Sequence, residues 1–359
     1  MSKTIGASIE TIYENGGYPM SNKSLLLENV GSRVSFNGEI REAKLYADES
    51  DEKNLWTSEV AYEVIRVING VPIFFEDHIE RLNASLVKLG AGTEFGVNDL
   101  LPLVSSLLAA NGAGDCNIKI QAASNGSGGT NILLNINKSF YPPPEYYADG
   151  VPVGLYAYTR EDPNVKKVVG SFKEQVKALM ESGGVFELLL YDSTRRLTEG
   201  SRSNLFFSRG EQLFTAPDRI ILKGIIRKYA FIAAERAGIE IVERPVTLEE
   251  IGLSPGSLGR RRAHGGALSG RSALEAQEPE PPKIKLKKNK KMLMFPTAVF
   301  EQKLPELTVN GAFLTGTSIG VLPIARIGGV ALKSAEAPVI KRIRAEYEKI
   351  AREYINSRT

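Results

Sequence analysis

Two adjacent lysines, Lys166 and Lys167, follow a proline-containing turn in the run DPNVKKVVG. A lysine amine becomes a nucleophile toward a carbonyl carbon when burial or neighbouring cations favour its neutral form. Most lysines, however, are solvated surface charges, and an acid such as Glu199 in LTEGSRSNLFF would by exposure statistics be a surface residue at a strand end. Any chemistry must therefore be argued from the order of several motifs.

Such an order exists along the chain. FNGE, AYEVIR and HIERLNAS precede the two lysines, and ELLLYD, LTEGSRSNLFF, ILKGIIR and FLTGTSIGVLP follow them. In this order they resemble the fold-type IV (class IV) pyridoxal-phosphate enzymes: branched-chain aminotransferase, D-amino-acid aminotransferase and aminodeoxychorismate lyase. The likeness spans about residues 34–251 and 309–350. It implies pyridoxal 5'-phosphate as the cofactor and a homodimer, because members of this family build the active site at a dimer interface.

The resemblance implies that Lys166 carries the cofactor as an internal aldimine. Substrate then enters by exchange of one imine for another, and the released amine moves the substrate α-proton as general acid and base. Lys167 is the rival, but the spacing to Glu187 and Glu199 fits the family only with Lys166 in register. Glu199 matches the acid that keeps the pyridine nitrogen protonated, so that the ring accepts electrons from the substrate.

The resemblance assembles the cofactor's phosphate site from three segments. Arg81 in HIERL supplies a guanidinium suited to bidentate contact with phosphate. Ile225 and Ile226 begin a predicted helix, whose free backbone N–H groups favour an anion. Thr317 and Ser318 in TGTS supply a hydroxyl and a neighbouring amide. A further residue, Leu222, is expected to pack on the face of the cofactor ring.

The substrate side is expected at Tyr62 and Arg66 in AYEVIR and at Lys119. Lys119 stands near the position of an arginine in the branched-chain enzymes, and a lysine offers a point charge where arginine offers a fork. The primary hypothesis is an aminotransferase that moves the amine of a branched-chain-like amino acid to a 2-oxo acid. The alternatives are a lyase that releases pyruvate from aminodeoxychorismate and a catalytically inactive family member that acts as a binding protein.

The sequence departs from the family's pattern in three regions. Ile226 stands where a threonine hydroxyl is usual, a difference of about 0.5–1.5 kcal/mol for one hydrogen bond. Ser171 and Phe172 occupy the region where an aromatic residue often follows the Schiff-base lysine, and Lys119 replaces arginine. Substrate identity is therefore the least constrained part of the hypothesis.

Composition excludes several other classes of protein. The chain of 359 residues has a formal net charge of +3, too small to argue for nucleic acid or a membrane surface. A single cysteine, Cys116, precludes an intrachain disulfide framework and favours a cytoplasmic location. The histidines His78 and His264 lie far apart, so no metal-ligand cluster is expected. His78, at a helix start, is expected to cap or pack. No apolar run is long enough to span a bilayer.

The elements that must position these residues form two predicted domains. Residues 34–146 are expected to form a smaller α+β domain, an α/β sandwich with a hairpin over 61–75, turning at Asn69-Gly70, two helices and two further strands. The Pro-rich stretch 141–150 is expected to be an extended linker. Residues 147–359 are expected to form the cofactor-binding domain, mostly antiparallel and barrel-like. The fold class is α+β.

Two segments differ from these domains in amino-acid composition. Residues 1–33 are polar and are expected to be a loosely attached extension. Residues 255–291 carry ten Lys or Arg against three Glu, a net charge of 10 − 3 = +7. Such a stretch buries too little apolar surface to offset the entropy of ordering. It is expected to be a disordered insertion without a direct catalytic role, the alternative being a basic tether for nucleic acid or an acidic partner.

Overall fold

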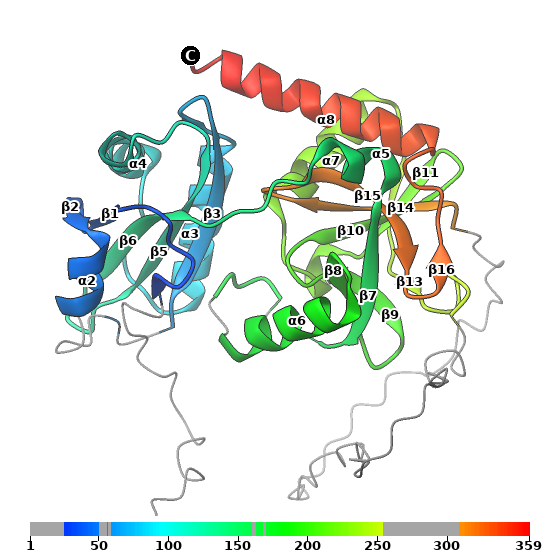
Figure 1. Ribbon diagram of the computed structural model, residues 1–359, viewed down its shortest axis with the longest axis horizontal. Helices are drawn as coiled ribbons and strands as arrows, with labels where there is room; N and C mark the ends of the chain where they lie inside the picture. The colour runs from blue at the N-terminus through cyan, green and yellow to red at the C-terminus, as the bar shows by residue number, and fades with distance from the viewer. Residues whose placement is uncertain (1–24, 50–55, 57–58, 160–162, 168–169, 254–308) are drawn as a thin grey trace, which may run out of the picture.

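Two β-sheets organise the molecule, each with its own helices (Figure 1). The computed structural model describes residues 25–49, 56, 59–159, 163–167, 170–253 and 309–359. The predicted insertion at 255–291 and the first 24 residues of the predicted extension lie outside the described residues. The predicted fold class is confirmed: the described chain combines an antiparallel first sheet with a curled, mostly antiparallel second sheet.

The first sheet has six strands in the order β2-β1-β6-β5-β3-β4, and every neighbouring pair is antiparallel. Its elements are β1 (Arg33–Phe36), β2 (Glu39–Glu42), α2 (Ala43–Glu49), β3 (Ala61–Ile68), β4 (Val71–Pro72), α3 (Phe75–Lys88), α4 (Val97–Asn111), β5 (Cys116–Ser124) and β6 (Thr130–Asn137). The predicted turn joins β3 to β4, with positive φ at both Asn69 and Gly70, as a two-residue hairpin requires. Helix α3 begins at Phe75, inside the segment predicted as strand.

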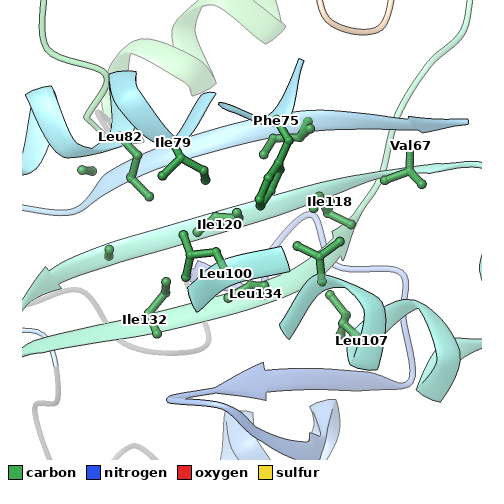
Figure 2. Close-up of a cluster of buried hydrophobic side chains, with 14 of the residues drawn as sticks. Val67, Phe75, Ile79, Leu82, Leu100, Leu107, Ile118, Ile120, Ile132 and Leu134 are labelled. Atoms are coloured by element: carbon green, nitrogen blue, oxygen red, sulfur yellow. The ribbon is translucent and has the colours of Figure 1, made fainter. Parts of the chain in front are cut away.

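Helices α3 and α4 cover one face of the first sheet. Their apolar stripes, such as Phe75, Ile79 and Leu82 of α3, meet alternate residues of the strands in a single buried cluster (Figure 2). The acidic residues Glu76 and Asp77 lie in the first turn of α3, where their negative charges interact favourably with the positive end of the helix dipole. Replacing a core residue such as Leu82 by alanine would cost about 2–5 kcal/mol.

Over β3 and β5 the opposite face of the first sheet is largely polar and carries the predicted substrate residues, whereas an apolar cluster with Phe36 and Leu133 covers it over β1 and β6. Directly paired residues of an antiparallel sheet share a face. The register pairs Tyr62 with Gln121, Val64 with Lys119, and Arg66 with Asn117. Ile118 and Ile120, by contrast, lie in the core cluster under the helices. This alternation in β5 presents Lys119 away from α3 and α4.

The second sheet has ten strands, and only three of its pairings are parallel, β11 with β12, β15 with β7, and β7 with β8. Its elements are β7 (Val151–Ala157), α6 (Gly170–Gly183), β8 (Glu187–Tyr191), β9 (Arg196–Gly200), β10 (Asn204–Arg209), β11 (Gln212–Thr215), α7 (Ile225–Arg236), β12 (Ile241–Glu243), β13 (Val246–Thr247), β14 (Gly311–Gly316), β15 (Gly320–Ile327), β16 (Val330–Ala331) and α8 (Pro338–Asn356). One apolar cluster lines the sheet's interior, and a second packs under α7 and α8.

Two expectations about connections need correction. The Pro-rich stretch is not extended throughout, because residues Pro144–Asp149 form the short helix α5. Proline suits a first helical position, where its missing N–H has no partner to lose, and this explains the helix start. The described end of the predicted N-terminal extension is not loose. Leu25 is buried against the first sheet, and Asn29 forms a bridge to Asn137 of β6.

Helix α8 runs from the second sheet toward α3 across the top of the view (Figure 1). The Tyr354 hydroxyl accepts a hydrogen bond from the Phe75 N–H, 2.9 Å away, and donates one to the Glu76 carboxylate at 2.6 Å. Phe74, just before α3, stacks on Tyr229 of α7 with ring centroids 3.4 Å apart. An apolar cluster with residues of β4, α7 and α8 therefore joins the two halves.

Candidate active site

The loop that precedes α7 is held from both halves of the molecule. The Leu222 N–H donates to Oε2 of Glu199 at 3.1 Å, and the Leu222 carbonyl accepts from Nδ2 of Asn204 at 2.8 Å. The next carbonyl, of Lys223, accepts from Nη1 of Arg81 at 2.8 Å. Five residues of the motifs LTEGSRSN, ILKGIIR and HIERL thus meet at the start of one helix.

Two glycines permit this close packing. A Cβ on Gly224 would lie 1.9 Å from Oδ1 of Asn204, and a Cβ on Gly200 would lie 2.2 Å from Oγ of Ser203 and 2.6 Å from Oε1 of Glu187. Any other residue at position 224 would displace Asn204, which holds the Leu222 carbonyl, and any other residue at position 200 would displace Ser203 and Glu187. The carboxylate of Glu199 is buried, so its negative charge is directed at the interior and not at solvent.

Arg81 belongs to a buried ion network behind this loop. Its Nε and Nη2 donate to the two oxygens of Glu63 at 2.7 and 2.6 Å, and Nδ1 of His78 lies 2.7 Å from the same carboxylate. Burial alone would raise the pKa of Glu63, but the Arg81 guanidinium and the His78 hydrogen bond lower it to about 2. Burial lowers the pKa of His78 despite its acidic partner. His78 is therefore buried, as expected of a packing residue. It also contacts the Glu63 carboxylate through Nδ1, which was not expected.

The two candidate lysines diverge. Nζ of Lys167 forms an ion pair with Glu59 at 2.7 Å, on an exposed edge. Nζ of Lys166 lies 4.8 Å from the ring centroid of Tyr62, and its charge contributes to lowering the pKa of buried His78. The Tyr62 N–H donates to the Lys166 carbonyl at 3.0 Å, which ties this segment to β3. Of the two amines, that of Lys166 faces the polar side of the first sheet.

Two more ammonium groups surround the same tyrosine ring. Nζ of Lys173, from α6, lies 5.1 Å from the Tyr62 centroid, and Nζ of Lys119 lies 5.6 Å from it. Lys119 was expected on this side, whereas Lys173 was missed. Lys173 lies shortly after Lys166, in the first turn of α6, and nothing in the sequence indicates that this turn packs against β3.

The predicted residues of the TGTS motif lie across the interface from β5. Oγ of Ser318 accepts a hydrogen bond from Nδ2 of Asn117 at 2.6 Å. Thr317, Ser318 and Ile226 line a cavity of about 420 Å³ together with His78 and Arg66. Arg66 stacks on Tyr141, with Cζ 3.5 Å from the ring centroid, so it lies at this cavity and not at the Tyr62 lysines.

These residues fit a phosphorylated aromatic cofactor. Arg81 uses three of its five N–H groups within the described chain, which leaves two for an anion. Gly224, at the start of α7, gives no side-chain cap, so the amides of the first turn are available to phosphate. Two buried hydroxyls nearby, of Ser203 and Thr315, make no hydrogen bond within the described residues. Those residues contain no cluster of three or more metal-ligand side chains.

The described residues also include no helix that is long and apolar enough to cross a lipid bilayer.

The chain is similar in sequence to known proteins. The sequence profile of the family described as Amino-transferase class IV matches residues 60–254, which is more than half of the chain. The chain is 24% identical over 233 residues to a D-alanine aminotransferase of Bacillus licheniformis, covering 61% of this chain and 81% of that protein. It is 28% identical over 229 residues to a putative branched-chain-amino-acid aminotransferase of Methanocaldococcus jannaschii, covering 57% and 78%.

Solved structures share the fold. The branched-chain amino acid aminotransferase of Thermobaculum terrenum, in its pyridoxal-phosphate form, matches with a TM-score of 0.65 at 20% identity, over 91% of this chain and 95% of that one. A putative 4-amino-4-deoxychorismate lyase of Legionella pneumophila matches with a TM-score of 0.59 at 16% identity, over 81% and 91%.

Proposed function

The chain belongs to the class IV aminotransferase family, and from this premise we propose that it transfers the amino group of an amino acid to a 2-oxo acid, with pyridoxal 5'-phosphate bound through Lys166. The choice of Lys166 rests on the different surroundings of the two neighbouring lysine side chains. The Lys167 amine is paired with Glu59 at the edge, whereas the Lys166 amine faces the polar side of the first sheet.

Each residue of the site then has a defined task. When bound, the cofactor supplies an electrophilic carbon for the substrate amine and a ring that accepts electrons. The carboxylate of Glu199 holds a proton on the ring nitrogen. Leu222, held by Glu199 and Asn204, packs against the ring face. Nζ of Lys166 would take the proton from the substrate's α-carbon and deliver it to the cofactor's electrophilic carbon, so that the amino group stays with the cofactor when the 2-oxo acid leaves.

The phosphate is assigned to groups from both halves. Arg81 supplies its two remaining N–H groups, fixed in direction by Glu63. Ile225 and Ile226 supply backbone amides, which do not depend on side-chain type, so the absence of a threonine hydroxyl at position 226 removes one contact and leaves the amides. Thr317 supplies a hydroxyl from the loop between β14 and β15.

The test of this assignment is a covalent one. Incubation with pyridoxal phosphate, reduction with borohydride and mass spectrometry of peptides should place a pyridoxyl adduct on Lys166. The adduct and the visible absorption band should be lost in Lys166→Ala and retained in Lys167→Ala. An unmodified Lys166 in the wild-type protein would remove the basis of the proposal.

Two rival functions remain distinguishable. A lyase of the aminodeoxychorismate type, favoured by the likeness to the Legionella structure, would form pyruvate from aminodeoxychorismate without a 2-oxo acid. A binding protein without catalysis would form neither pyruvate nor a new amino acid. For the aminotransferase, we expect glutamate to appear when 2-oxoglutarate is the acceptor. We further propose that the protein acts as a homodimer in the cytoplasm.

A further inference from the structure

The groups assigned to the phosphate carry too little positive charge for it. Arg81 is the one cationic side chain among them, and the two oxygens of Glu63 already accept two of its N–H groups, at 2.7 and 2.6 Å. Together these two side chains are neutral. The backbone amides of Ile225 and Ile226 and the hydroxyl of Thr317 are uncharged. The cofactor's phosphate carries close to two negative charges at neutral pH, so a further cation would complete the site.

His78 is placed to supply that charge. It lies in α3, one turn before Arg81, and only 1% of its surface is exposed. It also lines the cavity of about 420 Å³ that Ile226 and Thr317 line. His78 therefore reaches the same cavity as two of the groups assigned to the phosphate, which come from α7 and from the loop between β14 and β15.

The two ring nitrogens of His78 have different surroundings. Nδ1 lies 2.7 Å from Oε2 of Glu63. The pKa of Glu63 is about 2, so its carboxylate is ionised at neutral pH and Nδ1 must carry the hydrogen that it accepts. Nε2 makes no hydrogen bond within the described residues. In the neutral ring Nε2 is then an acceptor, and protonation turns it into a charged donor.

The surroundings of His78 determine when it is protonated. Burial lowers its pKa, Glu63 opposes this effect, and the positive charges of Arg81 and Lys166 lower the pKa further. The other titratable or charged side chains at the cavity come from β3 and α8: Arg66, Tyr347, Glu348 and Arg352. His78 is therefore neutral at pH 7 without a bound anion. A dianion in the cavity would favour the protonated ring, because an opposite charge nearby stabilises the charged form.

We propose that His78 is a further residue of the phosphate site, which takes up a proton when the cofactor binds and donates from Nε2 to a phosphate oxygen. This inference rests on the proposed function and adds one charged donor to it. The proton comes from solvent, and the hydrogen on Nδ1 stays between the ring and Glu63. Glu63 then serves the phosphate twice, because it directs Arg81 and stabilises the protonated ring. Cofactor affinity should fall as pH rises through the pKa that His78 has in the complex.

The test uses two ligands that cannot form an imine, pyridoxine 5'-phosphate and pyridoxine, which differ by the phosphate alone. Both carry an alcohol in place of the aldehyde, so their binding does not require a bond to Lys166. Calorimetry in two buffers of different ionisation enthalpy counts the protons taken up per ligand bound. At pH 7.5 the free phosphate is mostly a dianion. We expect the wild-type protein to take up at least about half a proton more with pyridoxine 5'-phosphate than with pyridoxine.

His78→Asn keeps a donor toward Glu63 and removes the nitrogen that titrates. It should abolish the additional proton uptake. It should also weaken the binding of pyridoxine 5'-phosphate about tenfold at pH 7, and its affinity should converge with that of the wild type by pH 9. The chain has one other histidine, His264, which lies outside the described residues. His264→Asn is the matched control and should behave as the wild type.

The protonation of His78 can also be followed directly. This is needed because Lys119 titrates in the same range, its pKa being lowered by burial to about 8. In His264→Asn the chain retains a single histidine, so the imidazole signals in an NMR spectrum belong to His78. They should move to the protonated position when pyridoxine 5'-phosphate is added at pH 7, and should stay when pyridoxine is added.

Equal proton uptake with the two ligands in the wild-type protein would overturn the inference. Additional uptake that persists in His78→Asn, or failure of pyridoxine 5'-phosphate to bind, would also overturn it. If His78→Asn does not fold, the NMR spectrum of His264→Asn decides. The borohydride adduct tests the proposed function separately. An adduct on Lys166 together with a His78 that stays neutral would refute only the inference, whereas a missing adduct would refute the proposed function.

Discussion

Gly224 leaves space at the start of α7 that the side chain of Asn204 fills. In Gly224→Ala, the new Cβ would overlap Oδ1 of Asn204, so Asn204 must rotate and release the Leu222 carbonyl. We expect a loss of about 1–3 kcal/mol in the free energy of unfolding, together with weaker retention of pyridoxal phosphate. Urea denaturation and cofactor titration measure the two effects. Gly92→Ala, which meets no atom within 4 Å, should change neither.

Glu63 makes stability depend on pH. Its pKa is about 2 in the folded protein against an ordinary 4.5, so the ionised form stabilises the fold above about pH 4.5. This contribution is lost as pH falls from 4.5 toward 2. Glu63→Gln leaves Arg81 and His78 without their acid and should destabilise the fold at pH 7 by about 3 kcal/mol or more.

The difference in unfolding free energy between wild type and Glu63→Gln should therefore shrink on acidification between pH 4.5 and 2. His78 also makes the wild-type protein less stable as pH falls. Burial lowers the pKa of His78 in the folded state, so the free energy of unfolding decreases as pH falls below 6.5. A difference between the two proteins that stays constant from pH 7 to 2 would contradict the ionised network.

Sequence motifs identified residues that meet at this site. They did not identify residues whose position depends on how the elements pack. Arg81, Glu199 and Leu222 were assigned from family patterns, and the structure brings them to one loop. Lys173 could not be assigned, because its proximity to Tyr62 depends on how α6 packs, which no local pattern encodes. Arg66, expected on the substrate side, stacks on Tyr141 and lines the cavity that Thr317 and Ser318 also line.

Among the elements, α8 joins the two halves through an apolar cluster and through the hydroxyl of Tyr354. Tyr354→Phe removes the acceptor of the Phe75 N–H and the donor to Glu76 while keeping the ring. We expect a loss of about 1–2 kcal/mol in unfolding free energy. Urea denaturation measures this loss. Tyr146→Phe is a suitable control, since the hydroxyl of Tyr146 makes no hydrogen bond within the described residues. Equal effects of the two substitutions would show that the hydroxyl of Tyr354 does not stabilise the contact between the two halves.

Helix α8 is amphipathic and buries Val339, Ile340 and Ile343 on one face. Its docking partner could not be predicted, because the residues that it meets, Phe75 and Glu76, are about 280 positions away. Short connections were harder for another reason. In the Pro-rich stretch, proline is compatible with both an extended strand and the first turn of a helix, and α5 follows the second alternative.

For the whole molecule, we predict a homodimer with twice the chain mass of 39.2 kDa. Sedimentation velocity at micromolar concentration should show one species near 2 × 39.2 = 78.4 kDa. A monomer that nevertheless forms the Lys166 adduct and turns over substrate would contradict an active site that depends on a second subunit.

The overall class of fold followed from the sequence because hairpin turns, apolar stripes and the motif order all indicated the same α+β arrangement. The predicted mostly antiparallel second domain agrees with the observed sheet, in which the parallel pairs involve β7, β8, β12 and their neighbours. Those parallel pairings join segments that are distant along the chain, such as β15 and β7, and no turn signal marks them.

The position of Tyr354 near the end of the chain has a consequence for synthesis. The last strand of the first sheet ends at Asn137, so 354 − 137 = 217 residues must still be added before Tyr354 is made. At about 5–20 residues per second, this takes roughly 10 to 40 seconds. During that interval we expect a nascent chain to fold its first sheet yet leave the amide of Phe75 and the apolar residues beside it uncovered, a surface to which chaperones bind until Tyr354 is made.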